Sequence, residues 1–279
     1  MLRRAAAATA PIVLVAFSLL VLPGQASART HSVHQPQFHP PIAALNASQS
    51  SNWSGYNQGT LEKNNTLFHS VSGHWTVPAA TAHTKGQAEY SSSWLGIGGG
   101  CVNSGCSVTD PTLIQTGTEQ DVGSNGQASY SAWWELVPAP SVTISSITVH
   151  PGDQMSASIS EAVSGSDLWT MTLKNLTTGQ SFSQTVPYPS THLTAEWIQE
   201  APTIIGSSGA NVGTLPNLSG GNFDLATTNG APAGLTPSEA IQLANSSGTV
   251  ESTPSAPDSD TDGFNDCTYA TTCAAPSGS

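Results

Sequence analysis

The chain has 279 residues and a formal charge of −12 at pH 7, with 18 acidic side chains and only 6 lysines and arginines. This charge argues against nucleic acid and anionic membranes as partners, because both repel an acidic surface. Only 9% of the residues are charged, so few native ion pairs are lost when carboxylates become protonated. The composition therefore suits a protein that works in acid.

The first 28 residues are typical of a secretory signal peptide. Arg3 and Arg4 form a positive start, residues 11–22 are mostly apolar, and Ala26-Ser27-Ala28 has the small-x-small form of a cleavage site. The apolar stretch is shorter than the roughly 20 residues that a membrane span needs. We therefore expect a secreted, extracellular protein whose mature chain begins near residue 29.

Residues 29–49 are polar and rich in proline and histidine. Such a composition is typical of segments that do not fold by themselves, so a short flexible leader or pro-segment is expected here. Its three histidines, His31, His34 and His39, have side chains that can bind a metal, but a solvated tail is the simpler interpretation.

Residues 50–271 are predicted to form a single all-β domain. Short stretches of alternating apolar residues recur between turn residues, and no long apolar helical period is present. This pattern is typical of an antiparallel β-sandwich or barrel. The predicted strands are 67–77, 88–97, 112–118, 128–137, 142–149, 154–159, 169–174, 181–186 and 193–198.

One segment near the end of the domain is predicted to be helical. Thr236-Pro237-Ser238-Glu239 has the form of a capping box, with proline at the first helical position. The short helix would continue through Asn245. Residues 272–279 are expected to form a disordered tail.

The four cysteines are interpreted as structural. An exported protein can form disulfides, and four cysteines allow three pairings. The pairing that is local in the sequence joins Cys101 to Cys106 and Cys267 to Cys273. Neither pair has the CxxC spacing of a zinc or redox site.

Several familiar catalytic motifs are absent from the sequence. It contains no GxSxG elbow, no HExxH zinc motif, no phosphate-binding loop followed by lysine and no Asp-Thr-Gly or Asp-Ser-Gly triplet of an aspartic peptidase. We therefore expect no catalytic metal and no cofactor. In Leu113-Ile114-Gln115-Thr116-Gly117, glutamine stands where an aspartic peptidase would have its aspartate.

Two predicted strands carry glutamates beside apolar residues. Alternate residues of a strand share a face, so Trp133 lies on the same side as Glu135, and Ile198 lies on the same side as Glu200. An apolar neighbour raises the pKa of a carboxyl group, which suits acid–base chemistry.

Seven motifs, in the same order, resemble those of the glutamic peptidases, or eqolisins, which are exported acid endopeptidases. They are residues 51–55, 75–78, 94–98, 113–117, 132–135, 174–180 and 195–200. Together they cover most of the mature domain, and the chain looks more like the bacterial members than the fungal enzymes. One departure is Gly98, where the family has an aspartate.

The resemblance implies a fold and a site. The fold is an antiparallel β-sandwich of two sheets, the lectin-like jelly roll of concanavalin A, with at most one short helix. The catalytic pair of the family falls on Gln115 and Glu200. The residues expected to bind substrate are Trp53, Trp94, Trp133 and Glu135.

Such a pair can hydrolyse a peptide bond without a covalent intermediate. An ionised Glu200 takes a proton from water and later passes it to the leaving amine, while Gln115 orients the water and donates to the oxyanion. The resemblance thus implies a secreted, pepstatin-insensitive acid endopeptidase that cleaves polypeptides as a monomer and binds neither nucleic acid nor membrane.

Structural calcium is the one cofactor that the sequence leaves open. Asp258, Asp260 and Asp262 form the DxDxDG start of a calcium loop, but Tyr269 stands where an EF-hand needs glutamate.

Two other functions also remain open. A secreted β-sandwich glycosidase would use Glu135 and Glu200 as its carboxylate pair and would not need Gln115. A non-catalytic sandwich would bind glycans or proteins. The joint presence of the Gln-Thr-Gly motif and the Ala-Glu-Trp-Ile-Gln-Glu motif favours the peptidase.

Overall fold

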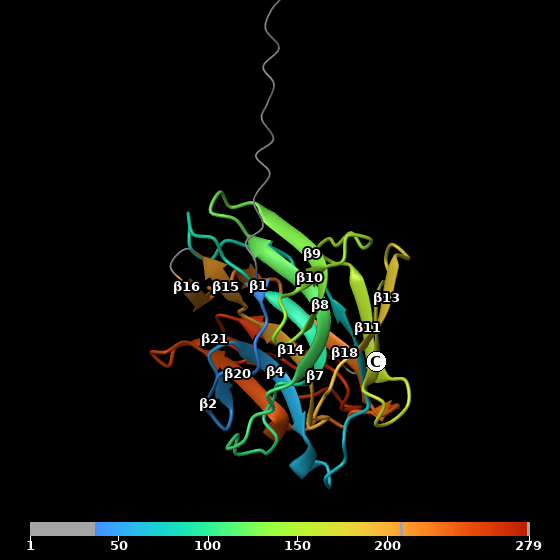
Figure 1. Ribbon diagram of the computed structural model, residues 1–279. Coiled ribbons are helices and arrows are strands. Elements are labelled where there is room, and N and C mark those ends of the chain that lie inside the picture. Colours follow the sequence, from blue (N-terminus) through green and yellow to red (C-terminus); the bar gives the residue numbers. More distant parts are fainter. Residues whose placement is uncertain (1–36, 207–208, 278–279) are drawn as a thin grey trace, which may run out of the picture. The chain divides into compact units, whose positions relative to one another are not determined.

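The computed structural model describes residues 37–206 and 209–277. The predicted signal peptide at 1–28 and the leader up to residue 36 lie outside the described residues. Within the described ranges almost all regular structure is β-strand (Figure 1), and helix is limited to two 3-10 turns, Thr60–Glu62 and Pro237–Glu239. No helix in these ranges is long and apolar enough to cross a membrane. The all-β prediction is confirmed.

Two large antiparallel sheets enclose the core and share one strand. The first sheet runs in the order β13 (Ser181–Pro187), β12 (Leu168–Asn175), β11 (Gln154–Glu161), β5 (Ser70–Thr76), β18 (Gly221–Thr228), β22 (Phe264–Thr268), β21 (Val250–Pro254) and β20 (Ala240–Ala244). The second sheet runs in the order β20, β4 (Trp53–Gly59), β14 (Thr194–Glu200), β7 (Ser92–Gly98), β8 (Leu113–Val122), β9 (Ala128–Leu136) and β10 (Val142–Thr143). Strand β20 therefore joins the two sheets along one edge.

Smaller strands extend these sheets or lie beside them. Strand β3 (Gln49–Ser50) pairs in parallel with β20, β2 (Ala44–Asn46) pairs with β3, and β19 (Ala231–Pro232) pairs with β18. Strand β1 (Gln37–Phe38) pairs with the hairpin of β15 (Thr203–Gly206) and β16 (Gly209–Val212), as Figure 1 shows. Strand β6 (Ala80–Thr81) pairs with β17 (Asn217–Leu218).

The core follows from strand alternation. One face of the second sheet contributes Leu95, Ile97 and Trp197 to the main apolar cluster, where they join Trp75 and Met155 of the first sheet. Because successive side chains of a strand point to opposite faces, the residues between them lie on the other face of the second sheet. That second face carries the predicted site.

Most predicted strands are present, and the exceptions have physical reasons. The stretch 142–149 is a strand only at Val142–Thr143; its apolar residues Ile144, Ile147 and Val149 are buried in the core from an irregular segment. The predicted helix through Asn245 is wrong. Its capping box exists, with Thr236 N donating to Glu239 Oε2 at 2.8 Å, but it opens only the 3-10 turn.

Strand β20 replaces the rest of that helix. In Ala240–Ala244 the residues Ile241 and Leu243 are buried and their neighbours Ala240 and Gln242 are less so. This period of two favours a strand over a helix, and pairing with β4 and β21 satisfies the backbone.

The two predicted disulfides are confirmed, and the described residues 37–49 and 272–277 make contacts that the predicted leader and tail did not anticipate. Cys101 is joined to Cys106, and Cys267 to Cys273. The second disulfide holds the segment predicted as a disordered tail, where Asn265 Nδ2 also donates to Ala274 O at 2.9 Å. Residues 37–49, predicted as part of a flexible leader, instead form β1, β2 and β3 against the domain.

Candidate functional site

Three rows of directly paired residues cross the second face of the second sheet. One row contains Glu196, Gly96, Gln115 and Glu135; the next contains Ile198, Trp94, Gly117 and Trp133; the third contains Trp53, Glu200, Ser92, Glu119 and Ser131. Strand register thus places Gln115 and Glu200 on one face with only β7 between their strands. All the predicted catalytic and substrate-binding residues lie on this face.

The Gln-Thr-Gly motif has a local structural reason at each position. Gln115 is on the site face, whereas Thr116 is on the core face and its Oγ1 donates to Trp133 O of the neighbouring strand at 2.7 Å. A Cβ atom on Gly117 would lie 2.4 Å from Ser93 O and 2.4 Å from Trp94 Cβ. Glycine is therefore required for Trp94 to pack beside Glu200.

Residue His39 of the leader lies at the centre of the predicted site. Gln115 Nε2 donates to the His39 carbonyl oxygen at 2.7 Å, and the His39 backbone N–H donates to Glu135 Oε2 at 3.1 Å. The His39 ring nitrogen Nδ1 lies 2.7 Å from Glu200 Oε2. The same ring stacks on Trp133, with centroids 3.8 Å apart and planes 5° from parallel.

Two tryptophans fix the carboxyl group of Glu200. Trp94 Nε1 donates to Glu200 Oε2 at 2.9 Å, and Trp53 packs edge-on against Trp94 with ring centroids 5.0 Å apart. All three residues are fully buried. The site residues that the sequence predicted are therefore in mutual contact, either directly or through His39.

The carboxyl groups of the site differ in their acidity. Burial raises the pKa of Glu200, although the charge of His39 and hydrogen bonds from His39 and Trp94 act against this. Burial raises the pKa of Glu135 to about 8, with the His39 charge opposing it. Burial lowers the pKa of His39, but the facing carboxylates Glu200, Glu119 and Glu135 outweigh burial and bring it to about 10.

Three acceptor atoms of the site remain available. The Oε1 atoms of Gln115, Glu135 and Glu200 are buried, and none has a hydrogen-bond partner among the described residues. Buried polar atoms in proteins are normally paired. These atoms are therefore suited to bind the polar groups of a ligand.

The structure gives a reason for glycine at position 98, where the family motif has an aspartate. Gly98 ends β7 with φ +93°, and a Cβ atom there would lie 2.1 Å from Thr112 O. No other residue fits this backbone without a rearrangement.

Sequence reasoning missed three members of the site region. Glu119 Oε1 lies 3.7 Å from His39 Nε2, and its spacing of four residues from Gln115 on one strand could have placed it on the same face. Glu196 is the second, and burial raises its pKa well above its ordinary value. His39 is the third: the composition of residues 29–49 predicts a solvated tail there, and no local pattern in the sequence distinguishes His39 from the other leader histidines.

In the structure the group of aspartates suited to calcium contains Asp258 and Asp262 of the predicted loop and Asp224 of β18, but not Asp260. Carboxylate oxygens of Asp224, Asp258 and Asp262 lie within 4.8 Å of one another. Burial and the charges of Asp260, Asp224 and Asp258 raise the pKa of Asp262 to about 6. Such an oxygen-rich group fits a hard cation such as Ca²⁺.

The fold and site together define the class: a two-sheet antiparallel sandwich with a buried glutamate and a glutamine on one face. Residues 51–262 match the Peptidase A4 family. The chain belongs to this family, the glutamic peptidases or eqolisins that its motifs resemble.

Two curated proteins give the sequence comparison. Aspergillopepsin-2 from Aspergillus niger is 32% identical over 176 residues, which is 56% of this chain and 57% of that protein. Scytalidopepsin B from Scytalidium lignicola is 31% identical over 181 residues, which is 63% of this chain and 61% of that protein. The chain thus spans about three fifths of the length of these relatives.

Solved structures agree on the fold. Scytalido-glutamic peptidase, bound to a transition state analog inhibitor, superposes with a TM-score of 0.58 at 21% identity and covers 78% of this chain and 98% of that one. SCP-B, an eqolisin in complex with the tripeptide Ala-Ile-His, gives a TM-score of 0.55 at 21% identity with the same coverage. At this identity the likeness concerns the fold.

Proposed function

We propose that the protein is a secreted acid endopeptidase in which Glu200 and Gln115 activate a water molecule for direct attack on a peptide bond, without a covalent intermediate. Membership of the Peptidase A4 family supports a peptidase. The observation that carries the proposal is the arrangement around His39: Gln115 donates to the His39 carbonyl oxygen, while the carboxyl group of Glu200 contacts the ring of the same residue.

Each step can be assigned to an atom of this site. Glu200, ionised, takes a proton from water while the water oxygen bonds to the carbonyl carbon. The carbonyl oxygen becomes an oxyanion that accepts from Gln115 Nε2. Glu200 then gives its proton to the amide nitrogen, and the carbon–nitrogen bond breaks. Loss of one oxyanion donor typically lowers the rate by about 10²–10³-fold.

Glu135 and Trp133 position the substrate in this proposal. Glu135 accepts the backbone N–H of the residue whose carbonyl is attacked, as it does with His39. Its pKa of about 8 keeps it protonated in acid, so it adds no negative charge beside Glu200. Trp133 supplies a flat face for the side chain of that residue.

The proposal also covers the export, oligomeric state, partners and cofactors of the enzyme. It is exported through the predicted signal peptide, acts as a monomer on polypeptides, and binds neither nucleic acid nor membrane. The hydrolysis needs no cofactor. Solved structures of the same fold that bind a transition state analog inhibitor and a tripeptide support peptide substrates.

A structural calcium ion at Asp258, Asp260 and Asp262, joined by Asp224, is part of the proposal. Because the pKa of Asp262 is about 6, calcium should bind near neutrality and be lost in acid. Addition of Ca²⁺ to EDTA-treated protein should raise Tm by about 5 °C at pH 7 and not at pH 4. If Ca²⁺ leaves the Tm of Asp258→Asn unchanged but raises the Tm of Glu62→Gln, the effect belongs to this loop.

The test of the function is cleavage of a denatured protein from pH 2 to pH 7 with pepstatin present. The wild type is compared with Glu200→Gln and Gln115→Ala, and the exposed Glu62→Gln and Gln184→Ala serve as matched controls. We expect cleavage limited to acid, abolished in Glu200→Gln and reduced at least 100-fold in Gln115→Ala. Full activity of Glu200→Gln would contradict the mechanism. Hydrolysis of glycans that survives Gln115→Ala would favour the glycosidase.

A further inference from the structure

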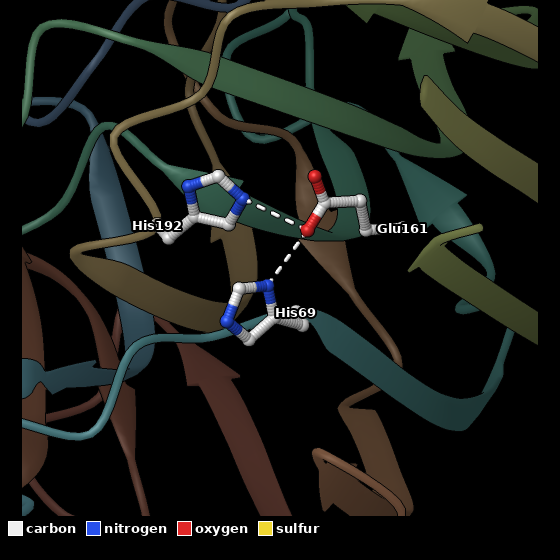
Figure 2. Close-up of side chains that lie close together, drawn as sticks. All are labelled: His69, Glu161 and His192. Carbon is white, nitrogen blue, oxygen red and sulfur yellow. Dashed lines mark hydrogen bonds and ion pairs between the residues drawn. The ribbon is translucent and has the colours of Figure 1, made fainter. Parts of the chain in front are cut away.

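We propose that His69, Glu161 and His192 form a zinc site whose fourth coordination position is open to solvent. Figure 2 shows the two imidazole rings converging on one carboxylate. Glu161 Oε2 lies 2.7 Å from His69 Nδ1 and 3.2 Å from His192 Nε2, and the three donor atoms lie within 4.8 Å of one another. None of these residues belongs to the proposed catalytic site, so the zinc site does not depend on the proposed function.

The three ligands come from parts of the chain that are distant in sequence. His69 immediately precedes β5, Glu161 is the last residue of β11, and His192 lies two residues before β14. Strand β14 carries Glu200 at its other end, and its six residue steps from Thr194 correspond to about 20 Å of strand. The proposed zinc is therefore remote from the proposed catalytic pair.

Backbone hydrogen bonds hold the three ligands together. Glu161 N donates to His69 O at 2.8 Å, which joins the end of β11 to the residue before β5. Phe68 N donates to His192 O at 2.9 Å, and His192 N donates to Ser190 Oγ at 3.1 Å. The fold itself thus sets the ligand positions, and a preorganised site loses little conformational freedom on binding.

Three nitrogen atoms crowd one oxygen of Glu161. Oε2 faces His69 Nδ1 and His192 Nε2, and it also accepts the Gly165 N–H at 3.0 Å. A carboxylate oxygen offers about two lone-pair sites, so it cannot give a separate one to each of three donors. A cation between the rings and the carboxylate removes this conflict, because Oε2 then has only the metal and the Gly165 N–H as partners.

Neighbouring groups orient two of the ligands. Glu161 Oε1 accepts the Asp167 N–H at 2.7 Å, so backbone N–H groups of residues 165 and 167 hold both carboxylate oxygens. His69 Nε2 lies 3.2 Å from Ser164 Oγ. A ring that donates from Nε2 to this hydroxyl keeps a lone pair on Nδ1, the nitrogen that faces Glu161. Outer partners of this kind are typical of metal ligands.

His192 is held by its backbone and by aromatic packing. Its ring centroid lies 5.1 Å from that of Trp169 and 4.8 Å from that of His69. Its φ of +61° falls in the left-handed region, which few residues other than glycine adopt. Such conformations are often retained at functional sites.

Small side-chain shifts are enough to admit the metal. Ligand bonds of about 2.0–2.2 Å at tetrahedral angles place two donor atoms about 3.4 Å apart. Glu161 Oε2 and His192 Nε2 are already 3.2 Å apart, whereas Oε2 and His69 Nδ1, at 2.7 Å, must separate by about 0.7 Å. His69 is the ligand that can move, because its side chain is 32% exposed and that of Glu161 is fully buried.

The ligand set favours zinc over hard cations. Two histidines, a carboxylate and a water are a common ligand set for zinc. Ca²⁺ and Mg²⁺ prefer oxygen ligands, whereas imidazole nitrogen suits zinc and its neighbours among the transition metals. The partly exposed His69 and the exposed Ser164 place the open position on the solvent side, where we expect water to fill it.

The test is titration of the EDTA-treated, dialysed full chain with Zn²⁺ alone at pH 7.5, where free imidazole is mostly neutral. Calorimetry measures the affinity and the stoichiometry. We expect one equivalent to bind and the Tm to rise by about 5–10 °C when zinc is at about 100 times its Kd. His69→Ala and His192→Ala should each bind at least about 10-fold more weakly. Because His192 is buried, the more exposed His69 keeps the test valid if His192→Ala does not fold.

Matched controls separate this site from other possible ligands in the chain. His150→Ala removes a histidine whose side chain is 64% exposed, and Asp258→Asn removes a carboxylate of the aspartate group proposed for calcium. A double variant, His31→Ala with His34→Ala, removes two leader histidines that lie outside the described residues. All three controls should bind zinc as the wild type does.

The outcomes that would overturn the site are distinct from a failure of the proposed function. Binding that is equal in wild type and His69→Ala, or absent in wild type, would overturn it. Loss of binding in the His31→Ala and His34→Ala double variant would place the zinc on the leader and would also overturn it. A chain that binds zinc through His69 but cleaves no substrate would keep the zinc site and lose the proposed function.

Discussion

At the scale of single residues, the indole of Trp94 sets the acidity of the proposed base. Its Nε1 donates to Glu200 Oε2, and this bond opposes the effect of burial on the pKa of Glu200. A hydrogen bond to a charged group contributes about 1.5–3 kcal/mol, which corresponds to about 1–2 pKa units. Trp94→Phe should therefore raise the pKa of Glu200 by that amount.

The consequence is a shift in the pH–rate profile. A base must be ionised to act, so the rising acid limb of kcat/KM in Trp94→Phe should move to higher pH by about 1–2 units. Trp169→Phe is the matched control, because Trp169 Nε1 donates to Tyr188 O in the core. An unshifted acid limb in Trp94→Phe would show that this bond does not tune Glu200.

The residues of the site differ in how far the sequence could reveal them. Gln115 and Glu200 stand in motifs whose order resembles a known family, and strand alternation places Glu135 beside Trp133. His39 could not be found in this way, because its burial depends on a chain path that joins β1 to β15. Pairing between distant segments leaves no pattern in the local sequence.

At the scale of strands, Gly117 controls the spacing between β7 and β8. A methyl group at this position would lie 2.4 Å from both Ser93 O and Trp94 Cβ, so the neighbouring strand or the Trp94 side chain must move. Overpacking of this kind typically costs about 1–3 kcal/mol. Because Trp94 also positions Glu200, Gly117→Ala should lower kcat by more than its loss of stability would explain.

The measurement is kcat together with the free energy of unfolding for Gly117→Ala and Gly105→Ala. A Cβ atom on Gly105 meets only the Asn103 side chain, at 3.8 Å, so this control should be close to wild type. We expect a loss of kcat of about 10-fold or more and a destabilisation of about 1–3 kcal/mol in Gly117→Ala. If Gly117→Ala is destabilised but keeps the wild-type kcat, the packing between β7 and β8 does not contribute to catalysis and the prediction is wrong.

Whether a predicted strand or helix is found in the structure also depends on the pairing between strands. Strands with clear alternation, such as β11 and β12, were predicted nearly in full. The capping box predicted at Thr236 is present as a local feature. It could not show that the backbone of Ile241 and Leu243 pairs with neighbouring strands. Tertiary pairing overrides a local helix signal here.

At the scale of the whole molecule, the buried carboxyl groups predict that stability is greatest in acid. Burial raises the pKa of Asp266 from 3.8 to about 7, although hydroxyl groups of Ser252 and Ser54 donate to it. Burial also raises the pKa of Glu135, Glu196 and Glu200. A carboxyl group whose pKa is higher in the folded state favours folding while it is protonated, so stability falls as the pH rises toward the folded-state pKa.

The pKa of Glu161 is shifted in the opposite direction and that of His39 in the same direction, and neither reverses this trend between pH 4 and pH 7. The His69 and His192 hydrogen bonds, with backbone N–H groups, outweigh burial and lower the pKa of Glu161 to about 2, so its contribution is lost only below about pH 4. His39, with a pKa of about 10, loses its contribution only as the pH rises above about 6.5. Surface ion pairs among the described residues, such as Lys63–Glu239, add little in either direction.

Denaturant unfolding at pH 4, 5.5 and 7 measures the effect, in a Gln115→Ala background that prevents self-digestion. The free energy of unfolding should fall from pH 4 to pH 7, with Asp266 alone contributing roughly 3 kcal/mol of the change. Adding Asp266→Asn should remove that share, because asparagine does not titrate, whereas adding the exposed Glu62→Gln should leave the slope as it is. A slope that Asp266→Asn does not alter would show that Asp266 is ionised in the folded protein at all three pH values, despite its burial.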